Sequence, residues 1–135
     1  MSMSYYFTIQ HPVIQKAISD LQKLLFDLMD NIKEVKLFGS TLKIPIEEAK
    51  DIDFLVDYAG DSFNHLKKQI ESINIGRRVI VQNMEMGYAN CPTWEKTDPL
   101  TLHILLYQKG KSMLSKKAIE TEKYAQNITN SIFQD

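Results

Sequence analysis

Apolar residues recur at intervals of three and four over about residues 12–31, the spacing that places them along one face of an α-helix. Pro12, at the start of this stretch, suits the first turn of a helix, where its missing N–H is not needed. We therefore predict an amphipathic helix over this range. The residues that define its apolar face are Ile14, Ile18, Leu21, Leu25 and Leu28.

Two later segments have the same helical spacing. The stretch from Phe63 to Ile73 predicts a second helix, with Asp61 or Ser62 as its N-cap. Apolar residues near the end of the chain predict a C-terminal helix over about residues 112–132.

Four segments are typical of β-strands. Residues 34–38 alternate between polar and apolar, whereas residues 51–58 have an almost continuous apolar middle, as expected of a central strand. Residues 77–82 and 100–107 predict two more strands, and the long loop 84–99 joins them.

The order of these elements predicts an α+β or α/β fold, and we take the α+β alternative. We expect a small mixed sheet of about four strands with flanking helices. The chain is short enough for a single domain over residues 1–135, with its core at residues 33–107.

Composition excludes a wholly disordered chain, a collagen-like repeat and a disulfide scaffold. Hydrophobic residues make up 44% and charged residues 24% of the chain, which is ordinary for a globular protein. The balance of 16 Lys and Arg against 17 Asp and Glu gives a net charge of −1, which does not indicate a nucleic-acid binder. Cys91 is the single cysteine, so no internal disulfide forms.

No apolar stretch is long enough to span a membrane, and the N-terminal sequence lacks the pattern of a signal peptide, so we expect a cytoplasmic protein without a membrane partner.

The segment that indicates a specific chemistry begins where the first strand ends. Gly39 lacks a side chain, so the backbone can turn sharply there and a bulky anion can approach it. Ser40 follows, and the free N–H groups of a short helix beginning at this residue would favour phosphate oxygens. Gly39 and Ser40 are therefore the candidate nucleotide-binding residues.

Two aspartates begin the next strand. Asp51 and Asp53 project from the same face because strand side chains alternate. Neighbouring carboxylates repel each other, and a divalent cation stabilises both as anions. Carboxylate oxygens suit Mg²⁺, which completes its shell with water and substrate phosphates. The sequence thus predicts a nucleoside triphosphate site with Asp51 and Asp53 as ligands of Mg²⁺, Mn²⁺ being the alternative ion.

These motifs resemble the nucleotidyltransferase superfamily related to DNA polymerase β, particularly its minimal nucleotidyltransferases. The signature of that family is a strand ending in Gly-Gly or Gly-Ser, a spacer, and Asp-hydrophobic-Asp on the next strand, which Gly39-Ser40 and Asp51-Ile52-Asp53 match. The resemblance implies that the Gly-Ser pair holds the triphosphate and that the two aspartates bind catalytic Mg²⁺. It further implies transfer of a nucleoside monophosphate to a hydroxyl, with release of pyrophosphate.

The sequence departs from this family at one point. Active members bring a third carboxylate from a later strand, but neither 77–82 nor 101–107 contains Asp or Glu. His103 stands where a third ligand would project and where the acceptor would enter, so it is a candidate catalytic residue. Its alternative role is that of a half-buried core histidine. Imidazole is a poor ligand for Mg²⁺ and a fair one for Mn²⁺ or Zn²⁺. Glu85 and Asp98 are the other candidates for the missing carboxylate.

Two functions remain open. The first is a Mg²⁺-dependent enzyme that transfers a nucleoside monophosphate from an NTP, with ATP as the default, to a hydroxyl acceptor. A protein or small-molecule acceptor is favoured over a large RNA because the net charge is near zero. The second is a catalytically inactive member of the same fold that binds or regulates a partner, or pairs with a second copy, through its C-terminal helix. Metal-dependent glycosyltransferases also contain Asp-x-Asp, but 135 residues is short for one.

Overall fold

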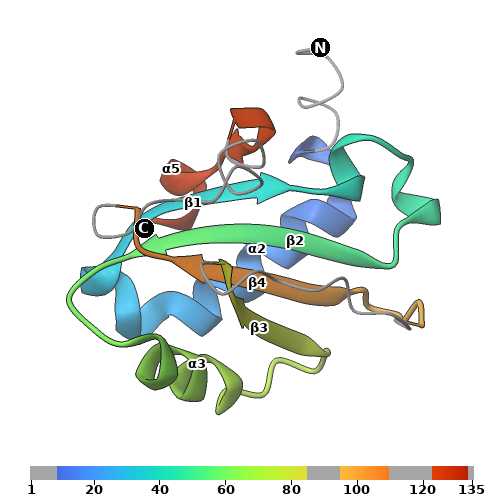
Figure 1. The fold of residues 1–135 in the computed structure, drawn as a ribbon. Coiled ribbons are helices and arrows are strands. Elements are labelled where there is room, and N and C mark those ends of the chain that lie inside the picture. Colours follow the sequence, from blue (N-terminus) through green and yellow to red (C-terminus); the bar gives the residue numbers. More distant parts are fainter. Residues whose placement is uncertain (1–8, 85–94, 110–122, 134–135) are drawn as a thin grey trace.

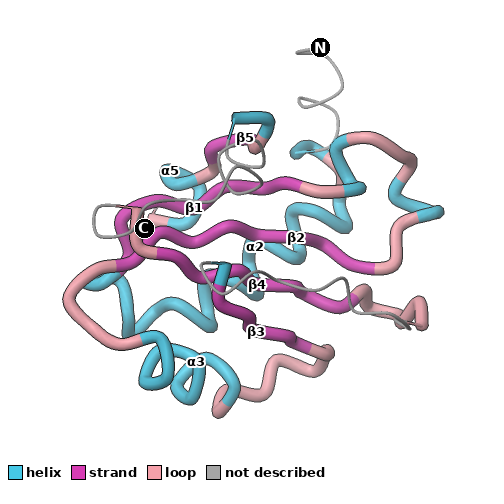
Figure 2. Tube along the Cα trace, viewed as in Figure 1, coloured by secondary structure: helices cyan, strands magenta, loops and turns pink. Residues whose placement is uncertain are grey.

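Five strands form one mixed sheet, and three α-helices accompany it, in the part of the chain that the computed structural model describes: residues 9–84, 95–109 and 123–133 (Figures 1 and 2). The predicted α+β class is therefore confirmed. The α-helices are α2 (Pro12–Leu25), α3 (Phe63–Glu71) and α5 (Thr129–Ile132), and the strands are β1 (Ile32–Phe38), β2 (Asp51–Tyr58), β3 (Val79–Asn83), β4 (Thr101–Tyr107) and β5 (Gln126–Asn127).

The strands lie in the order β3-β4-β2-β1-β5. β2 and β4 run parallel to each other, and β3 runs parallel to β4 at one edge. β1 is antiparallel to β2, and β5 is antiparallel to β1 at the other edge. Because the two parallel strands β2 and β4 begin at the same end of the sheet, their first residues lie side by side. This arrangement positions the site described below.

Helices cover one face of the sheet (Figure 1). Alternate residues of β2 and β4 point toward this face and pack with apolar residues of α2 and α3 in the main core. The fully buried members of this layer include Leu21, Ile52, Phe54, Val56, Leu66, Ile70, Leu102, Ile104 and Leu106. The intervening residues of the same strands point to the opposite face, where a smaller apolar cluster forms from Phe38, Leu55, Met84, Leu105 and Tyr107.

The N-terminal helix extends over the predicted range but changes type within it. α2 ends at Leu25, and the 3₁₀-helix η1 (Phe26–Asn31) completes the segment. The last turn closes when Ile32 N–H donates to the Met29 carbonyl, and the chain passes directly into β1. At the other end, His11 Nδ1 accepts from Val13 N at 3.1 Å and caps the helix.

The C-terminal helix predicted over about residues 112–132 is not continuous in the described part of the chain. Gln126 and Asn127 form the strand β5, which raises the predicted four strands to five, and α5 occupies only residues 129–132. The exposed edge of β1 explains this outcome because it offers unpaired backbone groups. Ile128 N donates to the Val35 carbonyl at 2.9 Å, and Val35 N donates to Thr129 Oγ1 at 3.0 Å. Residues 112–122 of the predicted helix lie outside the described ranges.

The middle of the chain follows the predictions with small shifts. Ser62 caps α3, since its Oγ accepts from His65 N at 3.2 Å. β3 begins at Val79 rather than at Arg77, which is turned inward to make a buried ion pair. In the described residues, no helix combines the length and the apolar character that crossing a membrane requires.

Candidate metal centre

The register of the central strands brings three chemically active side chains together. Asp53 on β2 is the direct neighbour of His103 on β4, and Asp51 is the neighbour of Thr101. Register partners on adjacent strands point to the same face of a sheet, and so do residues two apart on one strand. Asp51, Asp53 and His103 therefore share the face of the sheet opposite the helices.

The distances within this cluster are short. His103 Nδ1 lies 2.8 Å from Asp53 Oδ1 and 4.0 Å from Asp51 Oδ2. One ligand atom from each of the three residues can be chosen so that all lie within 4.8 Å of one another. The sequence placed the two aspartates on one face and proposed His103 as a neighbour, and the structure brings all three together.

A fourth residue, Gln82, completes the cluster. Its Oε1 lies 2.7 Å from His103 Nε2, so the imidazole is held between Gln82 on β3 and Asp53 on β2. Sequence reasoning did not select Gln82. The signal for it was one polar side chain at the end of the apolar run Val79-Ile80-Val81, but only the register of β3 against β4 reveals its partner.

The cluster is largely buried, and this burial alters its electrostatics. The side chains of Asp51, Asp53 and His103 are 16%, 12% and 7% exposed. Burial, the nearby Asp53 charge and a hydrogen bond to Asp53 raise the pKa of Asp51 from 3.8 to about 6, although the His103 charge opposes this rise. The imidazole therefore offsets only part of the negative charge of the two carboxylates. A bound cation would offset the remainder.

Gly39 closes one side of the cluster. It follows Phe38, the register partner of Asp53, and has a φ of +86°, a left-handed conformation that favours glycine. A Cβ at this position would overlap Asp53 Oδ2 and lie 2.8 Å from Asp53 Cγ. The expectation of a sharp turn at Gly39 is confirmed, and in this structure the group that approaches its backbone closely is the Asp53 carboxylate.

The segment between Gly39 and Asp51 contains two short turns of 3₁₀-helix. The first, η2 (Ser40–Leu42), begins at Ser40 as predicted, and the second is η3 (Ile46–Glu48), preceded by Pro45. A helix of three residues has a small dipole, so any phosphate contact here relies on individual backbone N–H groups.

The donor set of the cluster suits a divalent cation. Two carboxylates fit Mg²⁺, which prefers oxygen ligands, whereas the imidazole nitrogen fits Mn²⁺ or Zn²⁺ better. Asp51, Asp53 and His103 could therefore hold a metal ion. Asp98 does not supply a third carboxylate to this cluster, because it lines a separate pocket. Glu85 lies outside the described residues.

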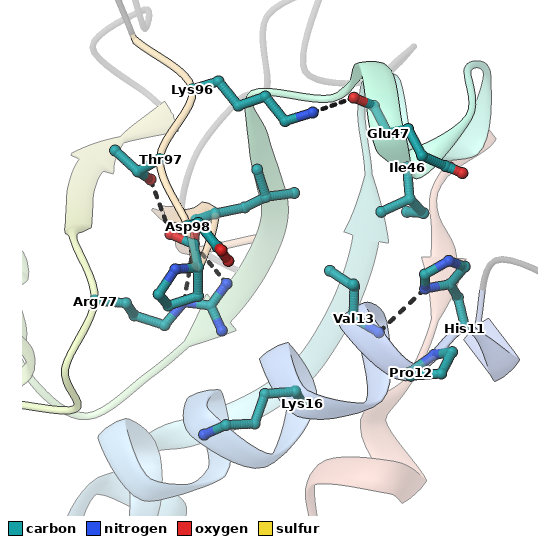
Figure 3. Close-up of a pocket in the computed structure, with 12 residues that line it drawn as sticks. His11, Pro12, Val13, Lys16, Ile46, Glu47, Arg77, Lys96, Thr97 and Asp98 are labelled. Atoms are coloured by element: carbon teal, nitrogen blue, oxygen red, sulfur yellow. Dashed lines mark hydrogen bonds between the residues drawn. The ribbon is translucent and has the colours of Figure 1, made fainter.

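That separate pocket, of about 760 Å³, lies between the start of α2 and the segment that precedes β4 (Figure 3). His11, Lys16, Arg77 and Lys96 contribute its basic side chains, and Lys96 Nζ donates to the Glu47 carbonyl. The described residues that line it do not include Asp51, Asp53 or His103.

Arg77 has a structural role at this pocket. Arg77 is the first residue of the predicted strand 77–82, but it precedes β3, and its side chain is only 1% exposed. It donates to Asp20 Oδ2 at 3.0 Å and, through Nε, to the Leu100 carbonyl at 2.9 Å. Burial raises the pKa of Asp20, but hydrogen bonds and charge from Lys16 and Arg77 outweigh this effect and hold it below 3.8. Arg77 thus ties α2 to the start of β4.

Comparison with known proteins does not assign the chain to a family. No family model matches the chain, and neither the curated proteins nor the solved structures include a match to it.

Proposed function

We propose that the protein is a nucleotidyltransferase-like enzyme that binds an NTP together with a divalent cation and transfers a nucleoside monophosphate to a hydroxyl acceptor. The observation that carries this proposal is the position of two carboxylates on one strand, the buried Asp53 and the partly buried Asp51, beside the Gly39 turn that ends the neighbouring strand. The sequence resemblance to the nucleotidyltransferase superfamily rests on these same residues.

Each residue has a defined role in this proposal. Asp51 and Asp53 hold the cation, for which the resemblance implies Mg²⁺. The resemblance assigns the triphosphate to Gly39 and Ser40, where individual backbone N–H groups would donate to its oxygens. The acceptor hydroxyl enters beside His103. ATP is the default nucleotide, and a protein side chain or a small alcohol is the acceptor we favour.

In the transfer, the acceptor oxygen forms a bond to the α-phosphorus, and the bond from that phosphorus to pyrophosphate breaks. The hydroxyl proton passes to solvent water, and pyrophosphate leaves with the bonding electrons. A bound cation supplies positive charge to the attacking and leaving oxygens. Asp51 and Asp53 fix where that charge lies because both extend from the rigid central strand β2.

A second candidate function is a catalytically inactive protein of the same fold that binds a nucleotide or a protein partner. The observation that favours it is His103, which occupies the place beside Asp53 where an active member of the superfamily would be expected to have a third carboxylate. The two candidates differ in one outcome: both allow nucleotide binding, but only the enzyme releases pyrophosphate.

Thermal unfolding with each NTP, with and without Mg²⁺ or Mn²⁺, tests the nucleotide site of the proposal, and pyrophosphate release in the presence of an acceptor tests the transfer. Ligand at 100 times its dissociation constant adds about 2.7 kcal/mol to the free energy of unfolding, a shift of several degrees in a domain of this size. We expect a metal-dependent shift in the wild type that the Asp51→Asn/Asp53→Asn variant loses. The matched control is Asp27→Asn/Asp30→Asn, which removes two exposed carboxylates from η1. The same shift in both double variants, or none in the wild type, would contradict the proposal.

A further inference from the structure

We propose that His103 Nδ1 is the third ligand of the metal centre and that Gln82 is a positioning residue that presents this nitrogen. The centre then selects a borderline transition cation, Mn²⁺ or Zn²⁺, over Mg²⁺. This inference deepens the proposed function, on which it rests for the use made of the cation, although metal binding itself can be measured without any nucleotide.

The hydrogen bonds of His103 lead to this assignment. Gln82 presents its carbonyl oxygen to Nε2 at 2.7 Å, so Nε2 carries the hydrogen and donates it. Nδ1 then faces the Asp53 carboxylate at 2.8 Å, and both of these atoms have lone pairs to offer. Either a hydrogen, carried by Nδ1 or by the carboxyl group, or a metal ion has to lie between them.

A metal ion satisfies more of the cluster than a proton does. An N–H at Nδ1 can donate a hydrogen bond to Asp53 Oδ1 at 2.8 Å. It cannot also donate to Asp51 Oδ2, because that oxygen lies 4.0 Å from the same nitrogen. A cation between the three side chains binds both carboxylates and the nitrogen together. Metal-bound histidines commonly donate their second ring N–H to a carbonyl or carboxylate, which fixes the ring and its tautomer. Gln82 supplies this contact here.

The identity of the ligand atoms sets the preference among cations. Mg²⁺ takes oxygen ligands and gains little from imidazole, whereas affinity for nitrogen-containing sites rises from Mn²⁺ toward Zn²⁺. The three ligands extend from neighbouring strands, β2 and β4, whose register fixes their separation. Replacing the nitrogen by an oxygen should therefore change the selectivity without dismantling the site.

Metal affinity of the nucleotide-free protein provides the first test. Dissociation constants for Mg²⁺, Mn²⁺ and Zn²⁺ are measured by calorimetry on the wild type and on His103→Asp. We expect the wild type to bind Mn²⁺ and Zn²⁺ at least about tenfold more tightly than Mg²⁺, and His103→Asp to reduce this ratio by about tenfold or more. Equal ratios in the two proteins would overturn the proposal.

A spectroscopic signature provides the second test and does not depend on a variant of His103 that folds. Pulsed electron paramagnetic resonance of bound Mn²⁺ detects a directly coordinated imidazole nitrogen. The chain contains 3 histidines, so His11→Asn/His65→Asn leaves His103 as the only one. The wild type and this double variant should both retain the nitrogen coupling. Its absence from the wild type, or its loss in the double variant, would overturn the assignment to His103.

Variants of Gln82 test its positioning role. Gln82→Glu retains an oxygen acceptor for Nε2–H, whereas Gln82→Met removes it at similar length. We expect Gln82→Met to weaken Mn²⁺ binding by about 10- to 100-fold and to change the nitrogen coupling, with Gln82→Glu restoring both. A loss of stability in Gln82→Met with unchanged metal affinity and coupling would assign Gln82 a purely structural role.

These outcomes separate the present inference from the proposed function. Nitrogen-coordinated Mn²⁺ without any NTP-dependent shift in thermal unfolding would leave the metal centre in place and contradict the nucleotidyltransferase. An NTP-dependent shift with Mn²⁺, lost in Asp51→Asn/Asp53→Asn but unaccompanied by nitrogen coupling, would support the nucleotide site of the proposed function and overturn the role given to His103.

Discussion

Asp53 and His103 are register partners on the parallel strands β2 and β4, and their side chains meet at 2.8 Å between Oδ1 and Nδ1. The backbone ladder thus fixes the separation of an acid and an imidazole that are 50 residues apart in the chain. Asp51 and Gln82 join them from β2 and from the edge strand β3. A cluster built on three adjacent strands is held more rigidly than one carried by loops, which is what a metal centre needs.

Gly39→Ala should damage this cluster and the fold together. A left-handed φ of +86° costs an alanine about 1–2 kcal/mol, and the added Cβ would displace the Asp53 carboxylate. We expect a loss of about 2–4 kcal/mol in the free energy of unfolding, with weaker metal binding. Urea unfolding and calorimetry measure the two effects.

Gly76→Ala is the matched control for this substitution. Gly76 has a φ of +77°, but a Cβ there would meet nothing within 4 Å, so the alanine suffers the backbone strain alone. It should lose about 1–2 kcal/mol and bind metal like the wild type. Equal losses in both variants would show that the contact between Gly39 and Asp53 is not energetically important.

Arg77→Met should destabilise the protein because it leaves Asp20 and the Leu100 carbonyl without their buried donor. Removing one member of a buried ion pair costs about 3–5 kcal/mol, and we expect the lower part of this range because Lys16 remains 2.6 Å from Asp20. Arg78→Met, which changes an exposed neighbour, should stay within about 0.5 kcal/mol of the wild type. Similar urea midpoints for the two variants would contradict the structural role of Arg77.

The stability of the metal-free protein should decrease as pH rises from about 4 to about 6. In the folded state the pKa of Asp51 is raised to about 6, so the folded protein keeps a proton in this window that the unfolded chain, with a pKa of 3.8, has released. The free energy of unfolding therefore falls as pH rises through the window. Asp51→Asn lacks this proton, so the difference between wild type and variant isolates the effect. A difference that is flat or rises with pH would contradict it.

Local patterns in the sequence predicted the elements whose packing depends on their own residues. The three- and four-residue spacing of Ile14, Ile18 and Leu21 located α2, and the apolar middle of residues 51–58 located β2 within its observed bounds. Period-two alternation also placed Asp51 and Asp53 on one face. These predictions succeeded because each depends only on residues that are close in the sequence.

The predictions that failed depended on contacts between distant segments. Gln126 and Asn127 follow a helical pattern, but hydrogen bonds to the open edge of β1 outweigh that preference. Arg77 opens the predicted strand 77–82, yet its side chain is buried because it pairs with Asp20, 57 residues earlier in the chain. Gln82 joined the site only through the order and register of the strands, which no local pattern specifies.

Anomalous diffraction from a crystal of the wild-type protein grown with Mn²⁺ and a non-hydrolysable NTP analogue tests the central claim most directly. We predict an anomalous peak bounded by Asp51, Asp53 and His103, with oxygen ligands from the aspartates, a nitrogen ligand from His103 and the triphosphate lying against Gly39. A crystal with the analogue bound elsewhere, or with no anomalous peak at Asp51 and Asp53, would contradict the account.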